Sequence, residues 1–142
     1  MGKFEDILES GKSQNEILEA IADWLISDFG NIHFSAIFLK QDGEFKLVVY
    51  GAGNPPAISE FPLTDPVYGK ATQGKIIMID KADSGAQIFF TRTVSTLTMP
   101  ILHEKDMKGI IHVGSMFVNA FKQTDLIFFS KCIRKLVETL QL

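Results

Sequence analysis

Apolar residues follow a helical period near both ends of the chain and a strand-like alternation between those ends. Spacings of three and four predict a helix over residues 14–29 and a second helix over residues 124–142. Ser13 and Glu16 form an S-x-x-E capping box directly before the first helix. Gly30 follows the last periodic residue of that helix, where we expect a left-handed C-cap. The two amphipathic helices need an apolar surface to cover.

The longest strand-like alternation runs from Thr93 to Phe117. It predicts two strands joined by a polar turn at residues 103–109. One face of this hairpin is mainly apolar and includes Leu97, Met99, Ile101, Ile111 and Val113. The other face is mixed and carries Thr96, Thr98 and His112. The mixed face either contacts water or lines a pocket, and the alternation leaves both possibilities open.

A second hairpin is expected earlier in the chain. Residues 33–40 and 45–50 have the apolar content of strands, and Asp42-Gly43 between them is a strong hairpin-turn signal. Further along, residues 58–63 and 75–79 predict two short strands.

A short helix is predicted between those two short strands. Asp65 and Pro66 have the residue types of an N-cap and of a first helical position, and Gly74 is expected to end the helix after about two turns. Residues 80–92 are the least regular stretch, and we expect a loop whose adjacent Phe89 and Phe90 cover another part of the molecule.

Length and composition fit one globular domain. The chain has 142 residues, of which 46% are hydrophobic, and a net charge of −3 without a basic stripe. We therefore expect a single domain over residues 1–142, with residues 1–12 as an N-terminal extension, and no nucleic-acid partner. No signal peptide is evident, and no apolar run approaches the roughly 20 residues that span a bilayer, so we expect a cytoplasmic protein without a membrane partner.

The order of these elements resembles the GAF domain, a small-molecule-sensing module of many signalling proteins. The resemblance covers roughly residues 13–141 and rests on the segments SAIFLKQDGEFKLVVYG, PVYGKATQGKIIMID, VSTLTMPIL, KGIIHVGS and FKQTDLIFF. It implies an α+β fold whose central antiparallel sheet has about six strands, within the usual size of a sheet. Terminal helices would cover one sheet face, and loops with the short helix would cover a pocket on the other.

One residue departs from the family pattern before the last helix. Lys122 stands where the family often has Ser or Thr, so we expect the N-cap of that helix at Thr124.

The resemblance also implies a ligand site. In GAF-like folds the mixed face of the hairpin lines the cavity, neighbouring strand residues share it, and the variable loop covers it. The ligand-binding residues expected on this basis are Thr96, Thr98, His112, Phe38, Ala36, Phe89 and Phe90. If His112 contacts the ligand, affinity should vary with pH near the pKa of this histidine, which is around 6.5 if its surroundings leave it unperturbed.

No catalytic or metal-binding residue is expected. Cys132 is the single cysteine, whereas the free methionine sulfoxide reductases, which resemble this fold, work with several, and one thiol cannot both attack and resolve within a chain. His33, His103 and His112 lack a second metal-ligand residue at a suitable spacing. The identity of any cofactor is left open.

These observations predict a non-enzymatic sensory or regulatory domain in signal transduction. It would bind a small molecule and relay the effect through its terminal helices to a signalling partner protein. The apolar stripes of helices 14–29 and 124–142 exceed what one sheet face needs, so we also expect a homodimer through these helices. Two alternatives stay open: a ligand-free dimerisation or interaction module of GAF-like fold, and a small redox enzyme on the same fold.

Overall fold

The computed structural model describes residues 2–81, 89–90 and 92–142. Its centre is a six-stranded sheet of order β3-β2-β1-β6-β5-β4, in which every neighbouring pair is antiparallel. The strands are β1 (Phe34–Gln41), β2 (Glu44–Tyr50), β3 (Glu60–Pro62), β4 (Ile77–Ile79), β5 (Ser95–His103) and β6 (Asp106–Ser115).

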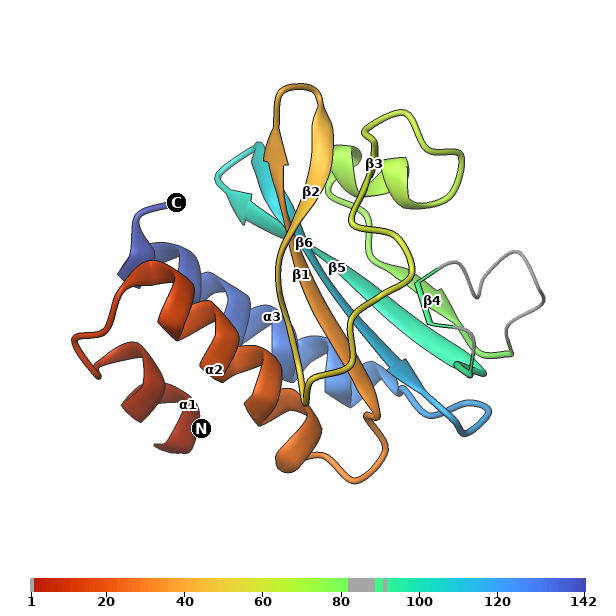
Figure 1. Ribbon diagram of the computed structural model, residues 1–142, viewed down its shortest axis with the longest axis horizontal. Coiled ribbons are helices and arrows are strands. Elements are labelled where there is room, and N and C mark those ends of the chain that lie inside the picture. Colours follow the sequence, from red (N-terminus) through yellow and green to blue (C-terminus); the bar gives the residue numbers. More distant parts are fainter. Residues whose placement is uncertain (1, 82–88, 91) are drawn as a thin grey trace.

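Helices lie on both faces of this sheet (Figure 1). Three α-helices, α1 (Gly2–Leu8), α2 (Gln14–Ser27) and α3 (Gln123–Leu140), cover one face, and the short 3-10 helix η1 (Tyr68–Gln73) lies on the other. The expected α+β architecture is confirmed.

The capping box of α2 is present as predicted. The Ser13 Oγ accepts the backbone N–H of Glu16 at 3.3 Å, and the Ser13 N–H donates to Glu16 Oε1 at 3.2 Å. The predicted end of the helix is wrong, because α2 ends at Ser27 and its C-cap is Asp28, whose N–H donates to the Trp24 carbonyl. The chain then turns so that Phe29 packs edge-on against Trp24, and Gly30 does not adopt a left-handed conformation.

The predicted N-cap at Thr124 is also wrong. Helix α3 begins at Gln123, and its N-cap is Lys122. Lysine has no side-chain oxygen with which to cap, but the Asp125 carboxylate accepts the Lys122 backbone N–H at 2.8 Å. Asp125 therefore supplies the bond that fixes the start of the helix, and Thr124 lies within its first turn.

Both hairpins form, with one difference in the longer one. Asp42 and Gly43 join β1 to β2 with positive φ angles of 53° and 77°, as a two-residue hairpin turn requires. In the β5–β6 hairpin, pairing continues to His103 opposite Asp106, so the predicted turn over 103–109 is too long. The pairing extends into those polar residues across a β-bulge next to Ile101 and Leu102, and Met107 is buried in the core on the side of η1.

The short helix has its predicted capping residues, Asp65 and Gly74, but it is a 3-10 helix. The Asp65 carboxylate accepts the N–H groups of Val67 at 3.0 Å and of Tyr68 at 2.8 Å, and Gly74 closes the helix with φ of 76°. Between these ends the backbone is 3-10 rather than α-helical.

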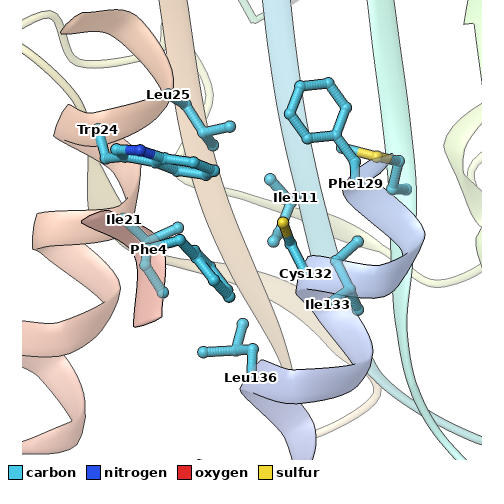
Figure 2. Close-up of a pocket in the computed structure, with 10 residues that line it drawn as sticks. Phe4, Ile21, Trp24, Leu25, Ile111, Phe129, Cys132, Ile133 and Leu136 are labelled. Carbon is cyan, nitrogen blue, oxygen red and sulfur yellow. The ribbon is translucent and has the colours of Figure 1, made fainter. Parts of the chain in front are cut away.

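The sheet separates two apolar cores. The main core lies under the α-helices and includes the predicted apolar face of the β5–β6 hairpin. Helix α1 contributes Phe4, whose ring centroid lies 5.1 Å from that of Trp24. The side chains at this junction leave a gap of about 10 Å³. Figure 2 shows Cys132 and Leu136 reaching toward it from α3. An apolar gap of this size has no room for a ligand.

Candidate functional site

Strand register gathers the residues predicted for the site on the sheet face away from the α-helices. Thr98 lies opposite His112 in the β5–β6 pair, and Ala36 lies opposite His112 in the β1–β6 pair. Thr96 lies two residues from Thr98 on β5, and Phe38 lies two residues from Ala36 on β1, so both share this face. All five residues are fully buried. The mixed face of the hairpin thus does not contact water.

Phe89 and Phe90 cover this face, as the sequence indicated. The Phe89 ring centroid lies 4.4 Å from that of His112, and the Phe90 ring stacks on the buried Phe34 ring at 4.9 Å. The remaining part of the predicted loop, residues 82–88 and 91, lies outside the described residues.

Two members of the aromatic cluster were missed from the sequence. Tyr68 on η1 lies 4.7 Å from Phe89, and Phe61 on β3 lies 5.3 Å from Phe89. Their signal was an aromatic side chain at the centre of a short strand and another just after the Asp65 cap. Both elements are too short for a periodic pattern to assign their faces.

The buried polar atoms of the site are incompletely paired. Thr98 Oγ1 and His112 Nδ1 are 2.7 Å apart and form a hydrogen bond. In contrast, Thr96 Oγ1 and His112 Nε2 are buried and have no hydrogen-bond partner among the residues that the structure describes. A buried polar group left unpaired costs about 1–3 kcal/mol, so native proteins keep few of them.

The Thr98 contact indicates which nitrogen of His112 carries its proton. If the Thr98 hydroxyl donates to Nδ1, the proton of the neutral ring is on Nε2, and only the Nε2–H group lacks a partner in this pair. In the other tautomer, the Nε2 lone pair and the Thr98 hydroxyl proton both lack one. The first arrangement leaves fewer groups unpaired, and we therefore assign Nε2–H as a donor.

Burial keeps the imidazole neutral. Loss of hydration lowers the pKa of His112 from 6.5 to about 3. The expected pH dependence near 6.5 held only for an unperturbed histidine, and burial moves the titration of His112 well below that range.

Side chains that carry charge are not part of the buried polar set. Across the described residues, that set consists of serines, threonines and His112: Ser35, Thr93, Ser95, Thr96, Thr98, His112 and Ser115. Tyr68 is also buried, and burial together with the nearby Asp65 carboxylate raises its pKa to about 12. The described lining of the site is thus uncharged at neutral pH.

Cys132 lies on the other side of the sheet. It belongs to the main core on α3, and burial raises the pKa of its thiol to about 11. A protonated thiol is a weak nucleophile. His33 and His103 lie elsewhere: His33 Nδ1 accepts the Met116 N–H, and His103 Nδ1 lies 3.1 Å from the Leu142 carbonyl.

Residues 2–81, 89–90 and 92–142 contain no cluster of three His, Cys, Asp or Glu side chains that could hold a metal ion. Nor does a helix in these ranges have the length and apolar character needed to cross a bilayer.

No protein-family model and no curated protein sequence matches this chain. Several solved structures match it. The type II free methionine-R-sulfoxide reductase of Thermoplasma acidophilum superposes with a TM-score of 0.81 at 18% identity, covering 96% of this chain and 95% of the other. The free methionine-R-sulfoxide reductase of Neisseria meningitidis, solved with its substrate, superposes with a TM-score of 0.86 at 17% identity. The match covers 99% of this chain and 85% of the reductase.

GAF domains match equally well. The GAF domain of an Acinetobacter phosphoenolpyruvate-protein phosphotransferase gives a TM-score of 0.81 at 16% identity, covering 98% of this chain and 89% of the other. The chain therefore has a GAF-like fold, one found both in GAF domains and in methionine sulfoxide reductases.

Proposed function

We propose that this protein is a non-enzymatic sensory domain that binds a small molecule between the β5–β6 hairpin and the segment carrying Phe89 and Phe90. The observation that supports it is the pair of buried, unpaired polar atoms, His112 Nε2 and Thr96 Oγ1, within an aromatic cluster. Mostly apolar surroundings with a few convergent polar groups are the usual composition of a small-molecule site. A ligand would supply the missing hydrogen bonds.

A relay to the helices has a structural basis. On β6, His112 faces the site, while its neighbours Ile111 and Val113 face the main core beneath the helices. On β1, the buried Ser35 hydroxyl donates to the Ala22 carbonyl of α2 at 2.8 Å. A ligand that shifts β1 or β6 would therefore displace groups that contact α2.

The test is a search for a bound ligand with a matched pair of histidine variants. We expect native mass spectrometry, or a thermal-shift screen against metabolites, to identify a compound that raises the melting temperature, because a ligand that binds only the folded state stabilises it. His112→Ala should abolish this stabilisation, and His103→Ala, at the exposed end of β5, should preserve it. Absence of any ligand would favour the interaction-module alternative, in which the site has no occupant.

The likeness to reductases favours a second candidate, a small redox enzyme. Thiol-based reduction of a sulfoxide needs a reactive thiolate, whereas Cys132 is buried and its pKa is raised. We therefore expect purified protein to leave free methionine sulfoxide unreduced in the presence of a thiol reductant. Turnover that Cys132→Ser abolishes would replace the sensory proposal with the enzymatic one.

A further inference from the structure

We propose that the ligand of this site is an uncharged ring compound with at least one hydrogen-bond acceptor, and that it takes the place now filled by the Phe89 side chain. This inference rests on the sensing function proposed above and names its ligand class. It is carried by the packing around Phe89, by the position of Phe89 in the chain, and by the polar atoms beside it.

The Phe89 ring occupies a slot made by four other rings. Its centroid lies 4.4 Å from His112, 4.7 Å from Tyr68, and 5.3 Å from both Phe38 and Phe61. The separations from Tyr68, Phe38 and Phe61 fall in the range that aromatic pairs prefer, and the separation from His112 lies just below it. Removal of Phe89 would leave a space with the shape of one six-membered ring and aromatic walls.

Among these five rings, Phe89 is the one that a strand or helix does not hold. His112, Phe38 and Phe61 belong to strands β6, β1 and β3, and Tyr68 belongs to η1. Phe89 itself lies outside the described strands and helices, and its carbonyl accepts the Ala57 N–H at 2.7 Å. Rotation of this side chain out of the slot breaks no strand pairing. Phe89 is therefore the ring that a ligand can displace.

The polar atoms of the site select for acceptors without charge. His112 presents Nε2–H, and Thr96 adds a hydroxyl that can donate or accept. An ionised ligand would lose its hydration here without a counter-charge among the described buried side chains, which disfavours its binding. A neutral carbonyl on a ring avoids that cost and completes the bond to Nε2–H.

The test uses benzamide and benzoate, which have nearly the same shape and differ in charge at neutral pH. We expect Phe89→Ala to bind benzamide at least tenfold more tightly than the wild type does, and to bind benzoate at least tenfold more weakly than benzamide. Phe45→Ala is the matched control, since Phe45 is equally buried in the same cluster and stacks on Phe61 at 4.7 Å. The space that Phe45→Ala leaves has no known unpaired polar atom beside it, so this variant should bind benzamide and benzoate without preference.

The possible results test the ligand class, the slot and the sensing function separately. Equal or tighter binding of benzoate overturns the ligand class and leaves the sensing function standing. No gain in benzamide affinity in Phe89→Ala overturns the slot, whereas a metabolite screen without any hit overturns the sensing function itself. If Phe89→Ala does not fold, NMR of ¹⁵N-labelled wild type decides instead: benzamide must shift the His112 Nε2–H signal more than benzoate does, and a proton on Nδ1 contradicts the assigned donor.

Discussion

Thr96 and Thr98 lie two residues apart on β5 and are both fully buried, yet they differ in hydrogen bonding. Thr96→Val keeps the side-chain shape and removes an unpaired hydroxyl, so we expect the ligand-free protein to gain on the order of 1 kcal/mol. Thr98→Val instead leaves His112 Nδ1 unpaired and should lose about 1–3 kcal/mol. Urea denaturation without added ligand measures both changes.

The two valine variants also distinguish a residue that serves ligand binding from one that serves stability. A residue retained for ligand binding can destabilise the free protein, and Thr96→Val should then weaken ligand binding while it raises stability. If both valine variants lose stability equally, Thr96 has a partner in solution, and the argument for an open hydrogen-bonding position at Thr96 is wrong.

His112 should make stability depend on pH. Its pKa is about 3 in the folded protein and 6.5 when solvated, so the unfolded chain binds more protons between these values and stability falls as pH falls below 6.5. From pH 7 to pH 5, this group should remove about 2 kcal/mol. Denaturation at both pH values should show that loss in the wild type and a smaller one in His112→Leu, which has no imidazole. Equal losses would mean that the ring is solvated.

At the scale of elements, the capping box of α2 offers a direct test. Ser13→Ala removes the side-chain acceptor for the Glu16 N–H and should cost on the order of 1 kcal/mol. Glu16→Ala should cost less, and the double variant should cost less than the sum, because both side chains serve one motif. Denaturation of the two single variants and the double variant measures this. Strict additivity would show that the two bonds form independently.

Elements with a regular period could be predicted, and their ends depended on contacts between distant residues. Alternation correctly placed Leu97 and Met99 on one face of β5, with Thr96 and Thr98 on the other. The end of α2 could not be read in this way, because it follows from the packing of Phe29 on Trp24.

The candidate site likewise contains residues that the sequence pattern could place and residues that it could not. Its strand residues could be predicted because a period of two assigns their faces. Tyr68 and Phe61 could not, since they come from elements of six and three residues that reach the site through tertiary packing alone. The unpaired state of His112 Nε2 likewise depends on all its neighbours in space, which alternation does not describe.

At the scale of the whole molecule, the apolar surface expected for a homodimer is smaller than the sequence indicated. The stripe of α2 is buried within one chain, and α1 adds Phe4 and Leu8 to the same core. On the outer side, Ile127 of α3 remains 55% exposed and Ile76 remains 39% exposed. These two residues line one surface hollow of about 300 Å³ together with Leu126 and Arg134.

A homodimer through α3 therefore remains a prediction, centred on Ile127 rather than on both terminal helices. We expect Ile127→Glu to give a folded monomer, because it places a charge in an apolar contact without disturbing the core. Leu140→Glu is less informative, since Leu140 packs against the main core and its loss also lowers stability. Thr139→Glu, exposed near the other end of α3, is the matched control and should leave association unchanged. Light scattering at high micromolar concentration decides the matter, and a wild type that is already monomeric there would assign the exposed Ile127 no role in self-association.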